Sequence, residues 1–155
     1  MCTWIKETWT LVRLFFTKIP DTLKTVQTKY YPAKKYCAMM WCGVLMTRDK
    51  PEAVSWSTQN HERIHLEQAK LKGSWFKFYT SYLGEYLRNR FLFLGHDAAY
   101  FLISYEMQAY AHEYDWGYKV TSENMKPYKL SRKEKRDAWK QHNTSWWAFC
   151  RRLDK

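Results

Sequence analysis

His61-Glu62-Arg63-Ile64-His65, an HExxH motif, is the stretch of this sequence that most constrains the fold. Residues four apart lie on one face of an α-helix, so a helix here lets both imidazoles bind a single metal ion. Glu62 follows the first histidine directly and can reach a metal-bound water as a general base. The motif therefore predicts a helix that carries two metal ligands and a catalytic carboxylate.

A small sheet is predicted just before the motif helix. Residues 36–47 are apolar on both alternating faces, which indicates a buried strand, or two short strands broken at Gly43. A further short strand is predicted at 53–56. Five Gly and four Pro in 155 residues argue against an all-β fold, which needs many tight turns. We therefore expect an α+β fold that is predominantly α-helical, with a small antiparallel sheet or hairpin before the HExxH helix.

Helical periodicity and capping residues predict the remaining elements. The Ser131-Arg132-Lys133-Glu134 segment matches a capping box. An amphipathic helix is expected at 3–19, closed by Pro20, and the motif helix is expected to be capped by Ser57 or Thr58 and ended by Gly73. An aromatic-rich helix capped by Ser74 and ended at 88–90 follows, and then a helix at about 98–117 capped by Asp97. Basic helices are expected within 131–153, the first running to about His142 and the last capped by Thr144.

Length and composition predict one domain spanning residues 1–155, with its core at about 36–116. None of the four cysteines forms a CxxC pair, which favours reduced thiols and a cytoplasmic setting. No apolar run approaches the length of a transmembrane span, and no signal-peptide pattern is present. We therefore expect a cytoplasmic protein without a transmembrane segment.

Glu106 is the candidate for a third metal ligand. A catalytic zinc commonly has three protein ligands and one position open to water. Glu106 lies on the separate helix predicted at 98–117, and Ala109 follows it by one turn on the same face. A small residue at that position lets this helix approach the motif helix closely. The expected cofactor is Zn²⁺, because two imidazoles and a carboxylate favour that ion.

The pairing of HExxH with the later ExxA element, Glu106 to Ala109, resembles the gluzincins, the zincins with a glutamate ligand. More narrowly, residues 60–68 (NHERIHLEQ) and 103–110 (ISYEMQAY) resemble small zincin-like proteins of uncharacterised function. The likeness covers about residues 36–116. The first 35 residues and the basic C-terminal segment lie outside it.

This resemblance implies a zincin-like helical core and a zinc-dependent metallopeptidase that acts on peptide or protein substrates. In that family His61, His65 and Glu106 would hold the ion, and Glu62 would be the catalytic base. Ligand histidines also need acceptors for their second N–H group, and the reaction needs groups that hold an oxyanion. The candidates for these roles are Asn60, Gln68, Tyr110 and Glu113, followed by Glu67, Tyr105, His112 and His96.

Other interpretations of the same residues remain open. The two histidines are also compatible with an ordinary helix, or with a metal site that has no peptidase activity. The net charge of +11 favours attraction to polyanions. The alternative function is therefore a non-catalytic module of zincin fold that binds nucleic acid, an anionic surface or a protein through its basic C-terminal region. A third interpretation is peripheral membrane attachment through the N-terminal helix and the aromatic-rich helix.

Overall fold

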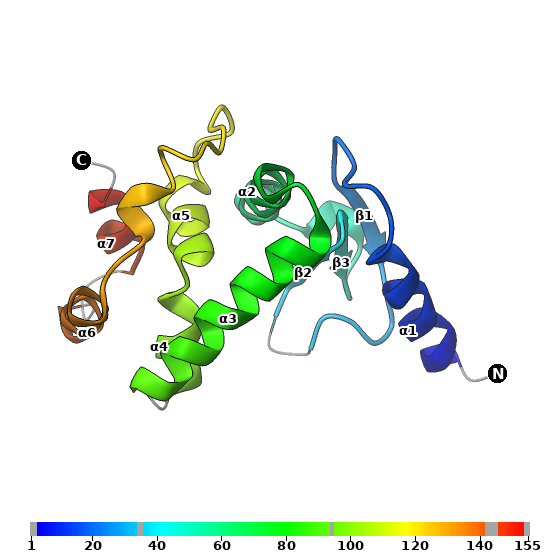
Figure 1. Ribbon diagram of the computed structural model, residues 1–155. Coiled ribbons are helices and arrows are strands. Elements are labelled where there is room, and N and C mark those ends of the chain that lie inside the picture. The colour runs from blue at the N-terminus through cyan, green and yellow to red at the C-terminus, as the bar shows by residue number, and fades with distance from the viewer. Residues whose placement is uncertain (1–2, 34–35, 94, 142–145, 154–155) are drawn as a thin grey trace.

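The computed structural model describes residues 3–33, 36–93, 95–141 and 146–153, which are mostly helical. It confirms the α+β fold class that the sequence predicted, with a small sheet before the helix that carries His61 and His65. Figure 1 shows α2 between this sheet and α5, with α3 crossing the same region. The elements are α1 (Thr3–Leu14), β1 (Lys24–Gln27), β2 (Ala38–Trp41), β3 (Val44–Thr47), α2 (Trp56–Lys72), α3 (Trp75–Phe93), α4 (His96–Phe101), α5 (Ser104–His112), α6 (Arg132–Gln141) and α7 (Trp146–Arg152), with 3₁₀ turns at Pro51–Ala53 and Lys126–Tyr128.

The expected hairpin is formed by β2 and β3, which pair antiparallel and are joined at Cys42 and Gly43. Both joining residues have positive φ, 49° and 82°, as two-residue hairpin turns require. The sheet also contains β1, which the sequence did not predict. It pairs parallel to β3 and makes the sheet mixed, in the order β1-β3-β2.

The strand predicted at 53–56 is wrong. Pro51 begins a 3₁₀ turn instead, because its ring fixes φ at a helical value and it has no N–H to donate to a strand. The N-cap of α2 is Ser55, whose side chain accepts a hydrogen bond from the Thr58 N–H, so the cap lies earlier than predicted. The predicted end at Gly73 is confirmed, with φ of 77°.

Several helix bounds differ from those expected. The first helix ends at Leu14 rather than at residue 19, because the N–H groups of residues 15–17 bond to carbonyls three residues back. The aromatic-rich helix continues to Phe93. In place of one helix at 98–117 there are two, α4 and α5. The break occurs before Ser104, whose N–H and hydroxyl both donate to the Glu85 carboxylate of α3.

The C-terminal capping box is confirmed. The Ser131 N–H donates to Glu134 Oε2 at 2.7 Å, and the Glu134 N–H donates to Ser131 Oγ at 3.4 Å. The helix that follows, α6, is observed to Gln141. His142 and Thr144, expected at the end of this helix and at the start of the next, lie outside the described residues.

Two buried clusters lie on the two sides of the candidate site. One joins the sheet to α2 and α3 and includes Met40, Leu66 and Phe78. The other joins α5 to the C-terminal elements and includes Met107 and Tyr128. Because α2 contacts β2, α3 and α5, its position fixes how these two clusters meet.

Substitution of Gly43 tests the hairpin. A Cβ at this position would lie 2.8 Å from Pro20 Cδ and closer still to Pro20 Cγ, in a backbone conformation that favours glycine. We expect Gly43→Ala to lower the free energy of unfolding by roughly 2–4 kcal/mol, measured by urea denaturation. Gly84→Ala is the control, because nothing lies within 4 Å of its Cβ and alanine favours the helix by about 1 kcal/mol. Equal stabilities of the two variants would contradict this account.

Lys135 predicts a pH dependence of stability. Its buried ammonium donates to Asn89 Oδ1 at 3.0 Å and lies 4.0 Å from Glu85 Oε2. Burial lowers the pKa of Lys135 to about 8 and outweighs the opposite effect of Glu85. The unfolded chain therefore binds more protons between about pH 8 and the ordinary lysine pKa of 10.5, so folding becomes more favourable as pH rises through that window.

Comparison with Lys135→Met isolates this effect, since methionine does not titrate. We expect the free energy of unfolding of the wild type, relative to the variant, to rise by roughly 2–3 kcal/mol across the window. Urea denaturation at several pH values measures it. Lys140→Met, an exposed position on the same helix, should follow the wild-type curve. Parallel curves for wild type and Lys135→Met would refute the assignment.

Candidate metal centre

The two motif histidines lie one turn apart on α2, on the side of the helix that faces α5. His61 is 7% exposed and His65 is 6% exposed, and their ring centroids are 4.9 Å apart. Ser55 begins this helix and Gly73 ends it, so the whole motif lies within regular helix. The i, i+4 spacing therefore presents both rings to the same volume, as the sequence predicted from helical geometry.

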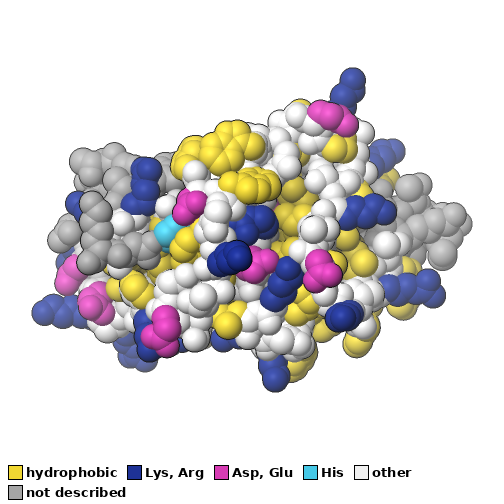
Figure 2. Space-filling model, turned by 90° about the horizontal axis from the view of Figure 1, so that it is seen from above, with side chains coloured by type: hydrophobic (Ala, Val, Ile, Leu, Met, Phe, Trp, Pro, Cys, Tyr) yellow, Lys and Arg dark blue, Asp and Glu magenta, His cyan; other side chains and the backbone are white. Residues whose placement is uncertain are grey.

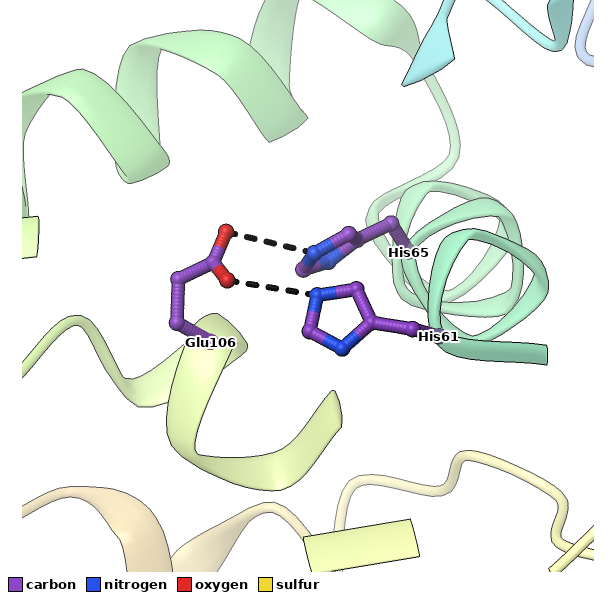
Figure 3. A group of neighbouring side chains, drawn as sticks. All are labelled: His61, His65 and Glu106. Carbon is purple, nitrogen blue, oxygen red and sulfur yellow. Dashed lines mark ion pairs between the residues drawn. The ribbon is translucent and has the colours of Figure 1, made fainter. Parts of the chain in front are cut away.

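Glu106 extends from the first turn of α5 toward both rings (Figure 3). Its Oε2 lies 3.3 Å from His61 Nε2, and its Oε1 lies 3.2 Å from His65 Nε2. The possible ligand atoms of these three residues all lie within 4.8 Å of one another. Three side chains from two separate helices thus form a buried group that could hold a metal ion.

The carboxylate and the two imidazoles of this group shift one another's pKa values. Burial by itself would raise the pKa of Glu106, but the two imidazoles outweigh it and hold that pKa well below its usual range. Burial by itself would lower the pKa of His61, but contacts with Glu106 and Glu113 raise it to about 10. The pKa of His65 is raised in the same way by Glu106. Since ligand imidazoles must be neutral, a metal ion has to displace these protons to bind here.

One carboxylate oxygen of Glu106 supports the fit to a cation. Among the described residues, Glu106 Oε2 is a buried atom without a hydrogen-bond partner, and its contact with His61 is an ion pair only. A buried carboxylate oxygen without a donor is costly unless a cation is close. The protonated His61 ring at 3.3 Å, or a metal ion that replaces its proton, supplies that charge. Two imidazoles and one carboxylate also match the ligand set of catalytic zinc sites with an open position.

The outer nitrogen of each imidazole has its own partner. His65 Nδ1 lies 2.8 Å from Gln68 Oε1, and the Gln68 amide donates in turn to the Tyr105 carbonyl. His61 Nδ1 lies 3.5 Å from Glu113 Oε2. Both rings therefore direct Nε2 toward Glu106. Partners of this kind fix the orientation of ligand histidines in metal sites.

Tyr82 is a site residue that sequence analysis missed. Its hydroxyl, on α3, donates to Glu106 Oε1 at 2.6 Å. Burial and the neighbouring Glu106 raise the pKa of Tyr82 well above its usual value, so the hydroxyl keeps its proton. The sequence contained no signal for this role, because Tyr79, Tyr82 and Tyr86 follow one another at helical spacing along the same helix.

Glu62 lies beside the triad rather than in it. Its Oε2 accepts a hydrogen bond from the Met40 N–H of β2 at 3.2 Å. Burial raises the pKa of Glu62, although His65 and His61 act in the opposite direction. Together with His65 and Glu106, Glu62 lines a cavity of about 350 Å³. The other lining residues are Tyr36, Ala38, Met39, Met40, Trp41, Phe78, Tyr79, Tyr82 and Tyr100.

The other expected supporting residues take different positions. The Asn60 amide donates to the carbonyls of His112, Glu113 and Asp115, each at 3.0 Å, and so ties α2 to the end of α5. The Tyr110 ring lies 4.5 Å from the His61 ring. The remaining candidates lie in other contacts: Glu67 with Lys70, Tyr105 with Ser81, His112 with Tyr128, and His96 with Tyr36 and Tyr86.

The surface carries charge of both signs. Figure 2 shows Lys and Arg side chains spread over one face of the molecule among Asp and Glu side chains, rather than gathered in a single patch. No helix in the described part of the chain has the length and apolar character to cross a membrane.

Comparisons with protein-family models, curated proteins and solved structures found no match to this chain.

The contact between Tyr82 and Glu106 predicts an effect on metal affinity. We expect the wild type to bind one equivalent of zinc, and Tyr82→Phe to bind it about 10- to 100-fold more weakly, because Glu106 loses the donor that orients its carboxylate. Competition with a chromophoric chelator measures both affinities. Tyr86→Phe is the matched control, since its hydroxyl on the same helix contacts His96 instead. Equal zinc affinities of the two variants would show that Tyr82 does not act on the site.

Proposed function

We propose that this protein is a zinc-dependent metallopeptidase. The observation that carries the proposal is the approach of the Glu106 carboxylate to within 3.3 Å of His61 Nε2 and 3.2 Å of His65 Nε2. A buried His₂Glu group is the ligand set of catalytic zinc sites that leave a position open to solvent. The cavity of about 350 Å³ at this group supplies access for a substrate.

When bound, zinc would lower the pKa of water to roughly 7 and polarise a carbonyl group. Within the chain, His61, His65 and Glu106 would hold the ion, with Tyr82 fixing the carboxylate of Glu106. Glu62, at the wall of the same cavity, would take a proton from the attacking water and pass it to the leaving amine.

The strand β2 supports a peptide as substrate. It lies at the edge of the sheet, and no other described strand pairs with its outer side. Residues 38–41 of β2 line the cavity, and the Met40 N–H on the outer side of this strand donates to Glu62. An extended peptide could add to such an edge by main-chain hydrogen bonds, with its scissile bond carried toward Glu62.

Substitution of Glu62 tests the mechanism. We expect Glu62→Gln to keep zinc binding within about threefold of the wild type and to reduce peptide hydrolysis at least 100-fold, because glutamine cannot accept the proton. Zinc titration and cleavage of a fluorogenic peptide library measure the two properties. Glu67→Gln is the control, since Glu67 pairs with Lys70 on the same helix and does not line the cavity.

Two outcomes would each contradict part of this proposal. Undiminished cleavage by Glu62→Gln would refute the role of this residue as base. If the wild type binds zinc tightly but cleaves no peptide of the library, the protein has a metal site and no peptidase activity. The second result would favour the alternative, a zinc-stabilised interaction module of the same fold.

A further inference from the structure

The long helix α3 carries large apolar side chains on two opposite faces. Trp75 and Phe78 point inward and are each 2% exposed. The outer face should be polar in a helix that only covers a core. It is instead occupied by a row of apolar residues spaced seven, four and four positions apart: Phe76 (64% exposed), Leu83 (53%), Leu87 (47%) and Phe91 (86%).

A second apolar row lies on α1 and the turn that follows it, formed by Trp9 and Val12 on the helix and Phe16 in the turn, of which Phe16 is 83% exposed. The C-terminal end of α1 approaches the N-terminal end of α3 (Figure 1). There the Phe15 ring lies 5.8 Å from the Phe16 ring and 6.5 Å from the Phe76 ring. Phe16 and Phe76 also line a shared groove of about 580 Å³. We call these two rows together the α1–α3 apolar surface.

Basic residues border this surface. On α3, the exposed side chains of Lys77 and Arg88 flank the outer row. Lys18 and Lys70 line the groove where the two rows meet, and Lys70 is paired with Glu67. The only acidic residue of α3, Glu85, is bound instead to the N–H and hydroxyl of Ser104 at 2.8 and 2.7 Å. The outer face of α3 therefore combines apolar side chains with cations and carries no carboxylate.

We propose that the α1–α3 apolar surface binds the surface of an anionic lipid bilayer. Aromatic and leucine side chains bordered by Lys and Arg are typical of helices that lie in the headgroup region. The net charge of +11 adds attraction to anionic lipid. The protein lies on the bilayer rather than across it, since no helix among the described residues is long and apolar enough to span one.

Co-sedimentation of the full chain with vesicles tests this proposal. We expect the protein to pellet with phosphatidylglycerol vesicles and to remain largely in the supernatant with phosphatidylcholine vesicles. Phe76→Ser and Phe91→Ser should each weaken the partition coefficient by about tenfold, because each removes a large apolar group from the interface. Lys77→Gln and Arg88→Gln should each weaken binding to phosphatidylglycerol by about fivefold.

Trp56→Ser is the matched control. Trp56 is 53% exposed but lies at the start of α2, away from the two rows, so its loss should leave binding unchanged. Circular dichroism checks that every variant is folded. The proposal fails if the wild type does not pellet with phosphatidylglycerol, or if Phe76→Ser and Phe91→Ser bind as well as Trp56→Ser. It also fails if the surface proves to join copies of the chain, seen as a dimer in sedimentation velocity that these Phe variants abolish without any vesicle binding.

Discussion

The buried carboxylate of Glu106 is the group around which the centre of this molecule is arranged. At 2% exposure it has lost most of its contact with water, and a carboxylate in that position must be compensated by nearby positive charge or by hydrogen-bond donors. His61 and His65 supply the charge, and Tyr82 supplies a donor. These partners come from α2 and α3, so a single side chain of α5 links three helices.

The surrounding structure holds these partners in place. The Glu62 carboxylate accepts a hydrogen bond from the Met40 N–H, and this bond attaches α2 to the edge strand β2. The Asn60 amide attaches the same helix to three carbonyls at the end of α5. The candidate metal centre therefore lies at the contact between two buried clusters rather than within either of them. Such a location combines fixed ligand positions with an adjoining cavity.

The candidate metal centre and the α1–α3 apolar surface involve opposite faces of α3. Its inner face contributes Phe78 and Tyr82 to the cavity beside the candidate metal ligands. Its outer face exposes Phe76 and Phe91. A helix that is apolar on both faces packs one face against the protein core and leaves the other available to a second apolar phase. The proposed lipid surface would cover the outer face of α3 without altering the packing of its inner face.

Local sequence determined the features that depend on short-range geometry. The HExxH spacing placed both imidazoles on one helical face, Gly43 marked the hairpin turn, and Ser131 with Glu134 marked a helix start, because these signals act within a few residues. The contacts made by Tyr82, the pairing of β1 with β3, and the break before Ser104 were decided only by tertiary structure. Each depends on a partner far along the chain: Glu106 for Tyr82, β3 for β1, and Glu85 for Ser104. Such partners come together only when the core packs. Helical or strand periodicity does not indicate which of several similar side chains will form the contact.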